Sequence, residues 1–297
     1  MRIISDDSHK KEERVLFPGM SQIITYPNTK RIEIIQKGVW IQYPLAEDFF
    51  NFLIDLDNQP RRPRMMGRTI IGKTGNGKTS LISNFIDFQI QQKNLPKIQH
   101  QYLYVTTPPN PSLKTLYLRT LYACGVDRCK GSTEELWHIL LTTLNKLQVR
   151  MIFYDDIEHL ANTQNDRILN LCRDVLKDIS NSLMIPIILS GTEKAEQLLL
   201  SDLQIKSRYP IIRLDEWKND KNFRILLHSF EMGLPLREPS YLENKELADL
   251  IYSLSEGTIG SISEVVMGSA VEALKRGEEK ITSNLINSLH FARFSRF

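Results

Sequence analysis

Residues 70–80 read IIGKTGNGKTS and contain the pattern Gly-x-x-x-x-Gly-Lys-Thr, formed by Gly72, Gly77, Lys78 and Thr79. The apolar run before this pattern predicts a strand, and the segment after it carries apolar residues at helical spacing. A strand, a glycine loop and a helix start form the context that a phosphate-binding loop requires. Backbone N–H groups and the partial positive charge of the helix start then face the phosphates. The stretch therefore predicts a nucleoside triphosphate site.

Each residue type in the loop has an expected task. Lys78 is expected to neutralise the β- and γ-phosphates, and the Thr79 hydroxyl to bind Mg²⁺. ATP and Mg²⁺ are thus the predicted cofactors. The residues expected to hold the nucleotide are Gly72, Lys73, Thr74, Gly75, Asn76, Gly77, Lys78, Thr79 and Ser80. A glycine-rich turn that matches by chance is the alternative, and the two correct flanks argue against it.

The composition is that of an ordinary globular protein. Of the 297 residues, 41% are hydrophobic and 25% are charged. No apolar run approaches the roughly 20 residues that cross a bilayer. The first residues lack the apolar centre of a signal peptide, and three cysteines are too few for a disulfide framework. We expect a bacterial cytoplasmic protein with no membrane partner.

The charge is unevenly distributed along the chain. Between Arg61 and Arg150 there are 14 Lys and Arg against 4 Asp and Glu, a balance of +10, whereas the whole chain carries +3. A positive segment on a nucleotide-binding core indicates a polyanionic partner larger than ATP, and nucleic acid is favoured. A solvated basic surface is the alternative.

The order of the expected elements indicates an α/β fold. Strands are predicted at residues 67–71, 101–107, 149–156, 184–192 and 207–214, with helices between them and a largely helical C-terminal part. Such alternation around a phosphate loop is typical of a parallel sheet with helices on both faces. Residues 1–60 are interpreted as an N-terminal arm and lead-in helix, 61–214 as the nucleotide-binding core and 215–297 as a small helical lid.

Two carboxylates end the third predicted strand. Asp155 is expected to hold Mg²⁺ together with Thr79. The following position carries a glutamate in many ATPases of this kind, where it polarises the attacking water; here it is Asp156, which is one methylene shorter. Glu158 is near in sequence, but its reach cannot be assumed. A solvated pair at the edge of the sheet is the alternative.

The next two elements supply further catalytic candidates. In an additional-strand P-loop ATPase, the strand at 184–192 lies between the loop strand and the Asp155 strand, and its last polar residue senses the γ-phosphate. Thr192 is the candidate, and Ser190 is an alternative; a plain turn would explain both residues nearly as well. Arg208 lies where ring-forming ATPases place an arginine that reaches the neighbouring subunit, although a solvated arginine fits the spacing equally.

Several motifs together resemble one family. The lead-in W-I-x-Y-P at residues 40–44, P-P-x-P-S at 108–112 and S-E-G-x-I-G at 255–260 accompany the loop and the acidic pair. With these motifs the chain resembles the TniB family of AAA+ transposition regulators, which is related to TnsC. The resemblance extends over most of the chain from about Gly38.

The resemblance implies an ATP-dependent regulator that forms rings or filaments on double-stranded DNA. It also implies recruitment of a DDE-type transposase and a TniQ-like targeting protein, with hydrolysis or disassembly regulating target choice. The positions that follow one DNA strand in relatives of TnsC correspond to Lys114, Lys130 and Ser132. Contacts of this kind to phosphates give sequence-independent, salt-dependent binding.

Two departures from the family pattern suggest slow hydrolysis. Asp156 replaces the expected glutamate, and Ser261 stands where many AAA+ proteins carry a sensor arginine. If the reach of Asp156 is limiting, Asp156→Glu should hydrolyse ATP faster. Two other functions remain open: a helicase loader for single-stranded DNA, which would use aromatic residues such as Tyr117 and Tyr122, and a signalling NTPase that binds proteins only.

Overall fold

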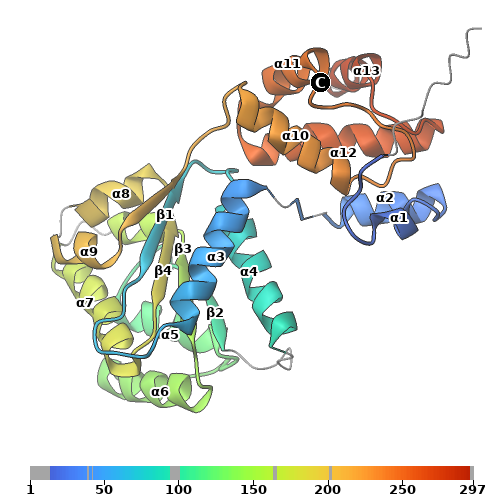
Figure 1. Ribbon diagram of the computed structural model, residues 1–297. Coiled ribbons are helices and arrows are strands. Elements are labelled where there is room, and N and C mark those ends of the chain that lie inside the picture. The colour runs from blue at the N-terminus through green and yellow to red at the C-terminus, as the bar shows by residue number, and fades with distance from the viewer. Residues whose placement is uncertain are drawn as a thin grey trace, which may run out of the picture. The chain divides into compact units, whose positions relative to one another are not determined.

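The computed structural model describes residues 14–38, 40–41, 43–93, 101–162, 166–200 and 203–294, and these form two compact units. The core unit comprises Pro44–Glu216 together with Thr258–Gly260. The helical unit comprises the described residues up to Tyr43, Trp217–Gly257 and those from Ser261 onward. Figure 1 shows the chain coloured from the N-terminus to the C-terminus.

A five-stranded parallel sheet forms the centre of the core unit. Its strands are β1 (Arg68–Gly72), β2 (Tyr102–Thr106), β3 (Met151–Asp155), β4 (Ile187–Gly191) and β5 (Ile211–Leu214). Their order is β2-β3-β4-β1-β5, and all described pairings are parallel. Since β4 lies between β1 and β3, the predicted additional-strand order is confirmed. Every residue of β3 and β4 is buried, as expected for strands that helices cover on both faces.

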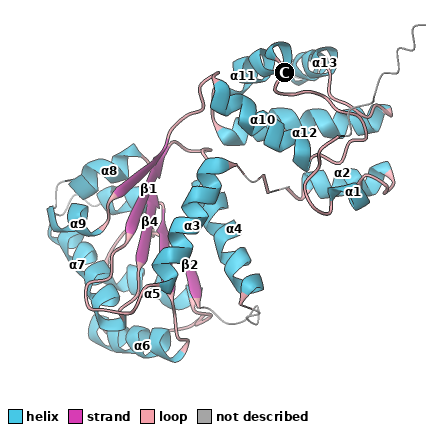
Figure 2. Cartoon of the chain, viewed as in Figure 1, coloured by secondary structure: helices cyan, strands magenta, loops and turns pink. Residues whose placement is uncertain are grey.

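Helices cover both faces of this sheet (Figure 2). On one face lie α3 (Pro44–Asn58) and α4 (Lys78–Gln92). The Phe85 ring of α4 has its centroid 5.9 Å from that of Phe153 on β3 and 5.7 Å from that of Phe50 on α3. These aromatic contacts fasten the helix that follows the phosphate loop to the middle of the sheet.

The opposite face of the sheet packs against a second set of helices. These are α5 (Leu113–Ala123), α6 (Thr133–Lys146), α7 (Asp166–Leu183) and α8 (Glu193–Leu200), with α9 (Leu203–Arg208) before β5 and the short 3-10 helix η1 (Ile157–Asn162) after β3. Tyr154 of β3 is fully buried here, and its hydroxyl lies 3.0 Å from that of Thr120 on α5. One hydrophobic cluster joins the strands to these helices.

The helical unit contains segments from both ends of the chain. Its helices are α1 (Met20–Ile23), α2 (Asn28–Gln36), α10 (Lys221–Gly233), α11 (Lys245–Ser255), α12 (Ile259–Arg276) and α13 (Ser283–Phe294), the first residues of α12 belonging to the core unit. Arg14 donates hydrogen bonds to the carbonyl oxygens of Glu231 (2.9 Å) and Leu234 (3.1 Å) at the end of α10. Such bonds satisfy carbonyls that a helix end leaves without a partner.

The described residues of the expected N-terminal arm and lead-in helix (1–60) divide between the two units, and residues 1–13 lie outside the described part of the chain. The described part up to Tyr43 packs with the C-terminal helices, and α3 packs with the sheet. Arg31 and Glu279, which are 248 positions apart, form a bidentate ion pair with N–O distances of 2.7 and 2.8 Å. A contact of this separation in sequence leaves no local pattern, which is why the sequence did not reveal it.

Candidate functional site

The glycine loop between β1 and α4 has the backbone shape that a phosphate requires. Gly75 and Gly77 both have φ of 79°, in the left-handed region that residues with a Cβ rarely adopt. Gly77 immediately precedes α4, so the first N–H groups of this 15-residue helix face the loop. This local geometry follows directly from the Gly-x-x-x-x-Gly-Lys-Thr pattern.

The loop is fastened on two sides within the core unit. The Asn76 amide donates to the carbonyl oxygens of Leu214 (2.6 Å), the last residue of β5, and of Asp215 (2.9 Å), which follows it. The Gly260 N–H at the start of α12 donates to the Gly75 carbonyl oxygen at 2.9 Å. Asn76, which is 3% exposed, is therefore a structural residue of the loop in addition to its expected place around the nucleotide.

Lys78 points into the loop. Its Nζ donates to the carbonyl oxygens of Gly72 at 2.7 Å and Lys73 at 2.9 Å. Burial lowers the pKa of this ammonium, and the Asp155, Glu158 and Asp156 carboxylates oppose that shift, in this order of strength. An ammonium inside a curled loop of N–H donors suits a chain of phosphates.

The Mg²⁺ candidates lie together at the carboxyl end of the sheet. Thr79 Oγ1 donates to Asp155 Oδ2 at 2.7 Å, and Asp155 is 1% exposed. A hydroxyl and a carboxylate are the hard oxygen ligands that Mg²⁺ prefers. The donor set therefore fits the predicted ion, which Thr79 and Asp155 would hold.

Tyr104 is a site residue that the sequence reasoning missed. Its hydroxyl also donates to Asp155 Oδ2, at 2.7 Å. Burial and this hydrogen bond to the carboxylate raise the pKa of Tyr104 to about 12, so the phenol keeps its proton. The parallel register pairs Thr106 with Asp155, and Tyr104 is two residues before Thr106 on the same face of β2. Only this pairing of β2 with β3 could have indicated the contact.

Asp156 and Glu158 have different environments. Asp156 has φ of 55°, and its N–H donates to Asp155 Oδ1 at 3.0 Å. Burial raises the pKa of the Asp156 carboxyl, and repulsion by Asp155 and Glu158 adds to the rise. Glu158 instead accepts a hydrogen bond from the Thr192 N–H at 3.2 Å. A Cβ on Gly191 would lie 2.5 Å from Glu158 Oε2, so the glycine makes room for this carboxylate.

A cleft of about 880 Å³ opens beside the phosphate loop in the core unit. It is lined by Lys73, Thr74, Glu158, His159, Thr192, Glu193 and Lys194. Of the two carboxylates described above, Glu158 therefore lines this cleft and Asp156 does not. Thr192 follows β4 and lines the cleft, as a sensor of the γ-phosphate must. Ser190 is fully buried, and its hydroxyl finds no hydrogen-bond partner within the part of the chain that the structure describes.

Arg208 lies inside the core unit. It is 4% exposed and donates to Ser180 Oγ and Asn181 Oδ1, both at 2.9 Å. An arginine that acts on a neighbouring subunit must reach the surface. The structure therefore does not support the expected arginine finger, because α9 directs this side chain onto the end of α7.

The residues expected to contact DNA are exposed and lie around α5 and α6. Lys114 is in the first turn of α5, and Lys130 is in the loop before α6. Ser132 caps α6 in a reciprocal arrangement, in which its Oγ accepts from Glu135 N and Glu135 Oε2 accepts from Ser132 N. The capping role explains this serine structurally whether or not it contacts DNA.

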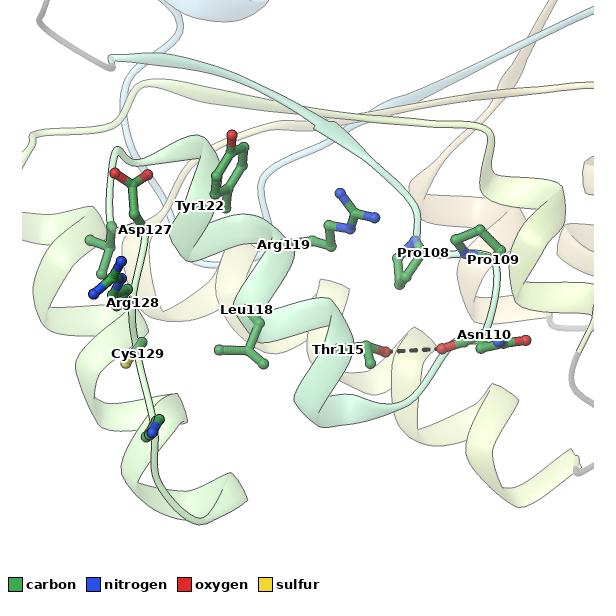
Figure 3. A pocket seen from close by; sticks show the side chains of 12 residues that line it. Pro108, Pro109, Asn110, Thr115, Leu118, Arg119, Tyr122, Asp127, Arg128 and Cys129 are labelled. Atoms are coloured by element: carbon green, nitrogen blue, oxygen red, sulfur yellow. Dashed lines mark hydrogen bonds between the residues drawn. The ribbon is translucent and has the colours of Figure 1, made fainter.

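A second hollow, of about 610 Å³, lies on the outer side of α5 (Figure 3). We call it the basic hollow; its lining residues are Pro108, Pro109, Asn110, Thr115, Leu118, Arg119, Tyr122, Val126, Asp127, Arg128, Cys129 and Lys130. In Figure 3 the loop with Asp127 and Arg128 lies on one side of α5 and the Pro108–Pro109 segment on the other. Lys130 thus belongs both to the expected DNA contacts and to this hollow.

Two further properties concern the described residues as a group. None of their helices is long and apolar enough to cross a bilayer. They also contain no cluster of three or more His, Cys, Asp or Glu side chains placed to hold a metal ion. Thr79 and Asp155 would therefore leave several Mg²⁺ positions to phosphate and water, as is usual for this ion.

The fold is similar to that of solved ORC and Cdc6 proteins. The Aeropyrum pernix ORC1 protein, solved in complex with DNA, matches with a TM-score of 0.58 and 14% identity, over 85% of this chain and 66% of that one. The A. pernix ORC2 protein, in ADPNP and ADP complexes, matches with a TM-score of 0.52 and 17% identity, over 82% of this chain and 65% of that one. Cdc6p from Pyrobaculum aerophilum matches with a TM-score of 0.53 and 18% identity, over 82% of this chain and 65% of that one.

The chain thus spans just under two thirds of each of these proteins, and identities this low bear on the fold alone. They confirm the predicted fold, a parallel sheet with helices on both faces together with C-terminal helices. A comparison with curated proteins gave no match. The family model of the bacterial TniB protein matches residues 31–219, well over half of the chain, and the chain therefore belongs to the TniB family.

Proposed function

We propose that this TniB-family chain is an ATP-dependent regulator of DNA transposition. It assembles on double-stranded DNA as a ring or filament and recruits a DDE-type transposase and a TniQ-like targeting protein. The observation that carries the proposal is the Thr79–Asp155 hydrogen bond of 2.7 Å beside the Lys78 loop, in a chain that matches the TniB family. The bond joins the two residues that Mg²⁺ requires in this class of ATPase.

ATP binding follows from the loop. Its N–H groups and Lys78 hold the phosphates, and Mg²⁺, when bound at Thr79 and Asp155, neutralises the charge that develops on them. Tyr104 keeps Asp155 oriented through the shared Oδ2 atom. Thr192, at the end of β4, contacts the γ-phosphate and so distinguishes ATP from ADP.

Hydrolysis needs a carboxylate that orients the attacking water, and Glu158 meets the requirement better than Asp156. Glu158 lines the cleft beside the phosphate loop, whereas Asp156 is not among the residues that line it. As the bond from the water oxygen to the γ-phosphorus forms and the bond to the ADP oxygen breaks, the water proton passes to Glu158. The products are ADP and inorganic phosphate.

DNA binding is supported by the charge of the segment that carries α5 and α6. The balance of +10 between Arg61 and Arg150 includes Lys114 and Lys130, both of which are exposed. In this proposal the two lysines and the Ser132 hydroxyl contact phosphates of one strand. Contacts of this kind carry little sequence information, which suits a regulator that follows a duplex.

Reversing the two charges is expected to weaken duplex binding strongly. Replacing Lys114 and Lys130 by Glu should reduce the slope of log K against log salt by about 2, because each phosphate contact accounts for about 1. Lys114 lies in the first turn of α5, where a carboxylate does not destabilise the helix. Fluorescence anisotropy with a labelled duplex over a salt series measures the effect.

Lys245→Glu is the matched control for a single reversal. Lys245 is exposed in the first turn of α11, in the helical unit. It changes the net charge equally and should leave the salt slope unchanged. Equal losses of duplex affinity in Lys114→Glu, Lys130→Glu and Lys245→Glu would mean that only the overall charge of the protein matters.

The assembly part of the proposal is tested by negative-stain electron microscopy with duplex DNA. We expect rings or filaments on DNA with ATP or a slowly hydrolysed analogue, and none with ADP. A Lys78→Ala variant should form none with any nucleotide. Isolated particles under all three conditions would count against assembly on DNA and favour a signalling NTPase.

A further inference from the structure

The basic hollow contains an exposed tyrosine that the nucleotide site does not use. Tyr117 and Tyr122 both belong to α5, but Tyr117 is 5% exposed and packs on Trp137, with ring centroids 5.4 Å apart. Tyr122 is 63% exposed and stands at the rim of the hollow (Figure 3). Only Tyr122 can therefore offer the face of its ring to a ligand.

The surroundings of Tyr122 combine apolar walls with positive charge. Leu118, Val126 and the two prolines provide the apolar surface. Arg119, Arg128 and Lys130 provide three cations against the single carboxylate of Asp127, a balance of +2. Within the described parts of the chain, none of these three cations forms an ion pair. A ligand that fits must present a flat apolar group next to negative charge.

We propose that the basic hollow binds one unpaired nucleotide of a DNA strand. Its base stacks on the Tyr122 ring, and its flanking phosphates lie at Arg128 and Lys130. The inference rests on the DNA binding proposed above. It adds a preference for duplexes in which one base is unpaired. A cationic groove with an aromatic platform is the arrangement by which proteins hold single-stranded nucleic acid.

A paired base is a poor ligand for this site. Extruding a base from an intact duplex costs unpairing and unstacking, and stacking on one tyrosine returns at most a similar amount. A base that is already unpaired does not carry that cost. The hollow therefore discriminates between paired and locally opened DNA and does not itself open the duplex.

An acidic peptide fits the hollow less well. A peptide bound in an extended form needs hydrogen-bond partners for its backbone. The Thr115 hydroxyl, in the wall of the hollow, is already hydrogen-bonded to Asn110 O at 3.1 Å (Figure 3). The wall also carries three cations, Arg119, Arg128 and Lys130, which suit phosphate oxygens.

The test compares two duplexes that differ by one base. One is fully paired, and the other carries a single unpaired adenine; anisotropy measures the affinity of the full chain for each, with ATP and Mg²⁺ present. The wild type is expected to bind the second about tenfold more tightly, as one stacked base provides. Tyr122→Ala should remove this preference, and Tyr122→Phe, which keeps the ring, should retain it.

Tyr241→Ala is the matched control, since Tyr241 is 43% exposed in the helical unit. It should leave the preference unchanged. Equal wild-type affinity for both duplexes, or a preference that survives in Tyr122→Ala, would overturn the inference and leave a protein partner as the candidate occupant. Binding to the fully paired duplex without any preference for the unpaired base would overturn this inference and leave the proposed function intact. Binding only when a base is unpaired would support the hollow and refute binding to intact duplex DNA.

Discussion

Glu158→Gln is expected to lower the rate constant for ATP hydrolysis by about 10²- to 10⁴-fold, the usual contribution of a positioned proton acceptor. The amide keeps the size of the side chain and an oxygen that can accept from the Thr192 N–H, so the cleft should keep its shape. Phosphate release under single-turnover conditions measures the loss. Binding of a fluorescent ATP analogue should stay near that of the wild type, which separates chemistry from binding.

Asp156→Asn is the matched control, because it neutralises the neighbouring carboxylate. A loss of less than about tenfold is expected, since most of the acid–base contribution would remain with Glu158. Asp156→Glu also distinguishes the two carboxylates. A faster variant would mean that the reach of Asp156 limits hydrolysis, and an unchanged rate would support Glu158 as the proton acceptor. A larger loss in Asp156→Asn than in Glu158→Gln would contradict the assignment. A wild type that binds ATP without hydrolysing it would contradict it as well, and would leave the binding part of the proposed function intact.

Arg31→Ala is expected to destabilise the helical unit by about 3–5 kcal/mol, the cost of removing one partner of a buried ion pair. Arg31 is fully buried and donates to Glu279, to Asn28 Oδ1 at 2.7 Å and to Pro235 O at 2.8 Å. Glu279 keeps a second partner in Arg237 and is 17% exposed, so the lower end of the range applies. Arg237→Ala, whose side chain is 53% exposed, should cost no more than about 1 kcal/mol.

The measurement must report on the helical unit alone, because the two units need not unfold together. The chain has three tryptophans, and Trp137 is in the core unit while Trp40 and Trp217 are in the helical unit. A Trp137→Phe background therefore gives a fluorescence signal from the helical unit during urea unfolding. Equal losses for Arg31→Ala and Arg237→Ala would contradict the buried role of Arg31.

The ion pair of Arg31 and Glu279 predicts that the stability of the helical unit depends on pH. The hydrogen bond from Arg31 is the largest cause that lowers the pKa of the Glu279 carboxyl below its ordinary value. A carboxyl whose pKa is lower in the folded state contributes stability that is fully present above its unfolded pKa. That contribution is lost as the pH falls through the folded pKa. The acid limb of the stability curve should therefore be shallower in Arg31→Ala than in the wild type.

Local patterns in the sequence predicted the parts of the site that are continuous in the chain. The loop with Lys78 and Thr79 and the strand that ends at Asp155 could be predicted, because short motifs of glycine, lysine and carboxylate determine both local structure and chemistry. Even the position of β4 between β1 and β3 followed from the class that these motifs indicate.

The parts that could not be predicted depend on contacts between distant segments. Tyr104 meets Asp155 only through the register of β2 on β3, and Arg31 meets Glu279 across most of the chain. Arg208 had a suggestive spacing, but its burial depends on how α9 packs on α7. Tyr117 and Tyr122 lie on one short helix, and only the packing of α6 distinguishes the buried ring from the exposed one.

The hydrogen bond from Gly260 to Gly75 joins the first turn of α12 to the phosphate loop. The first residues of this 18-residue helix belong to the core unit, and Ser261 and the residues after it belong to the helical unit. A helix of this length is a stiff rod of about 27 Å. A displacement of the Gly75 carbonyl when phosphates enter the loop would act directly on the first turn of that helix through this hydrogen bond.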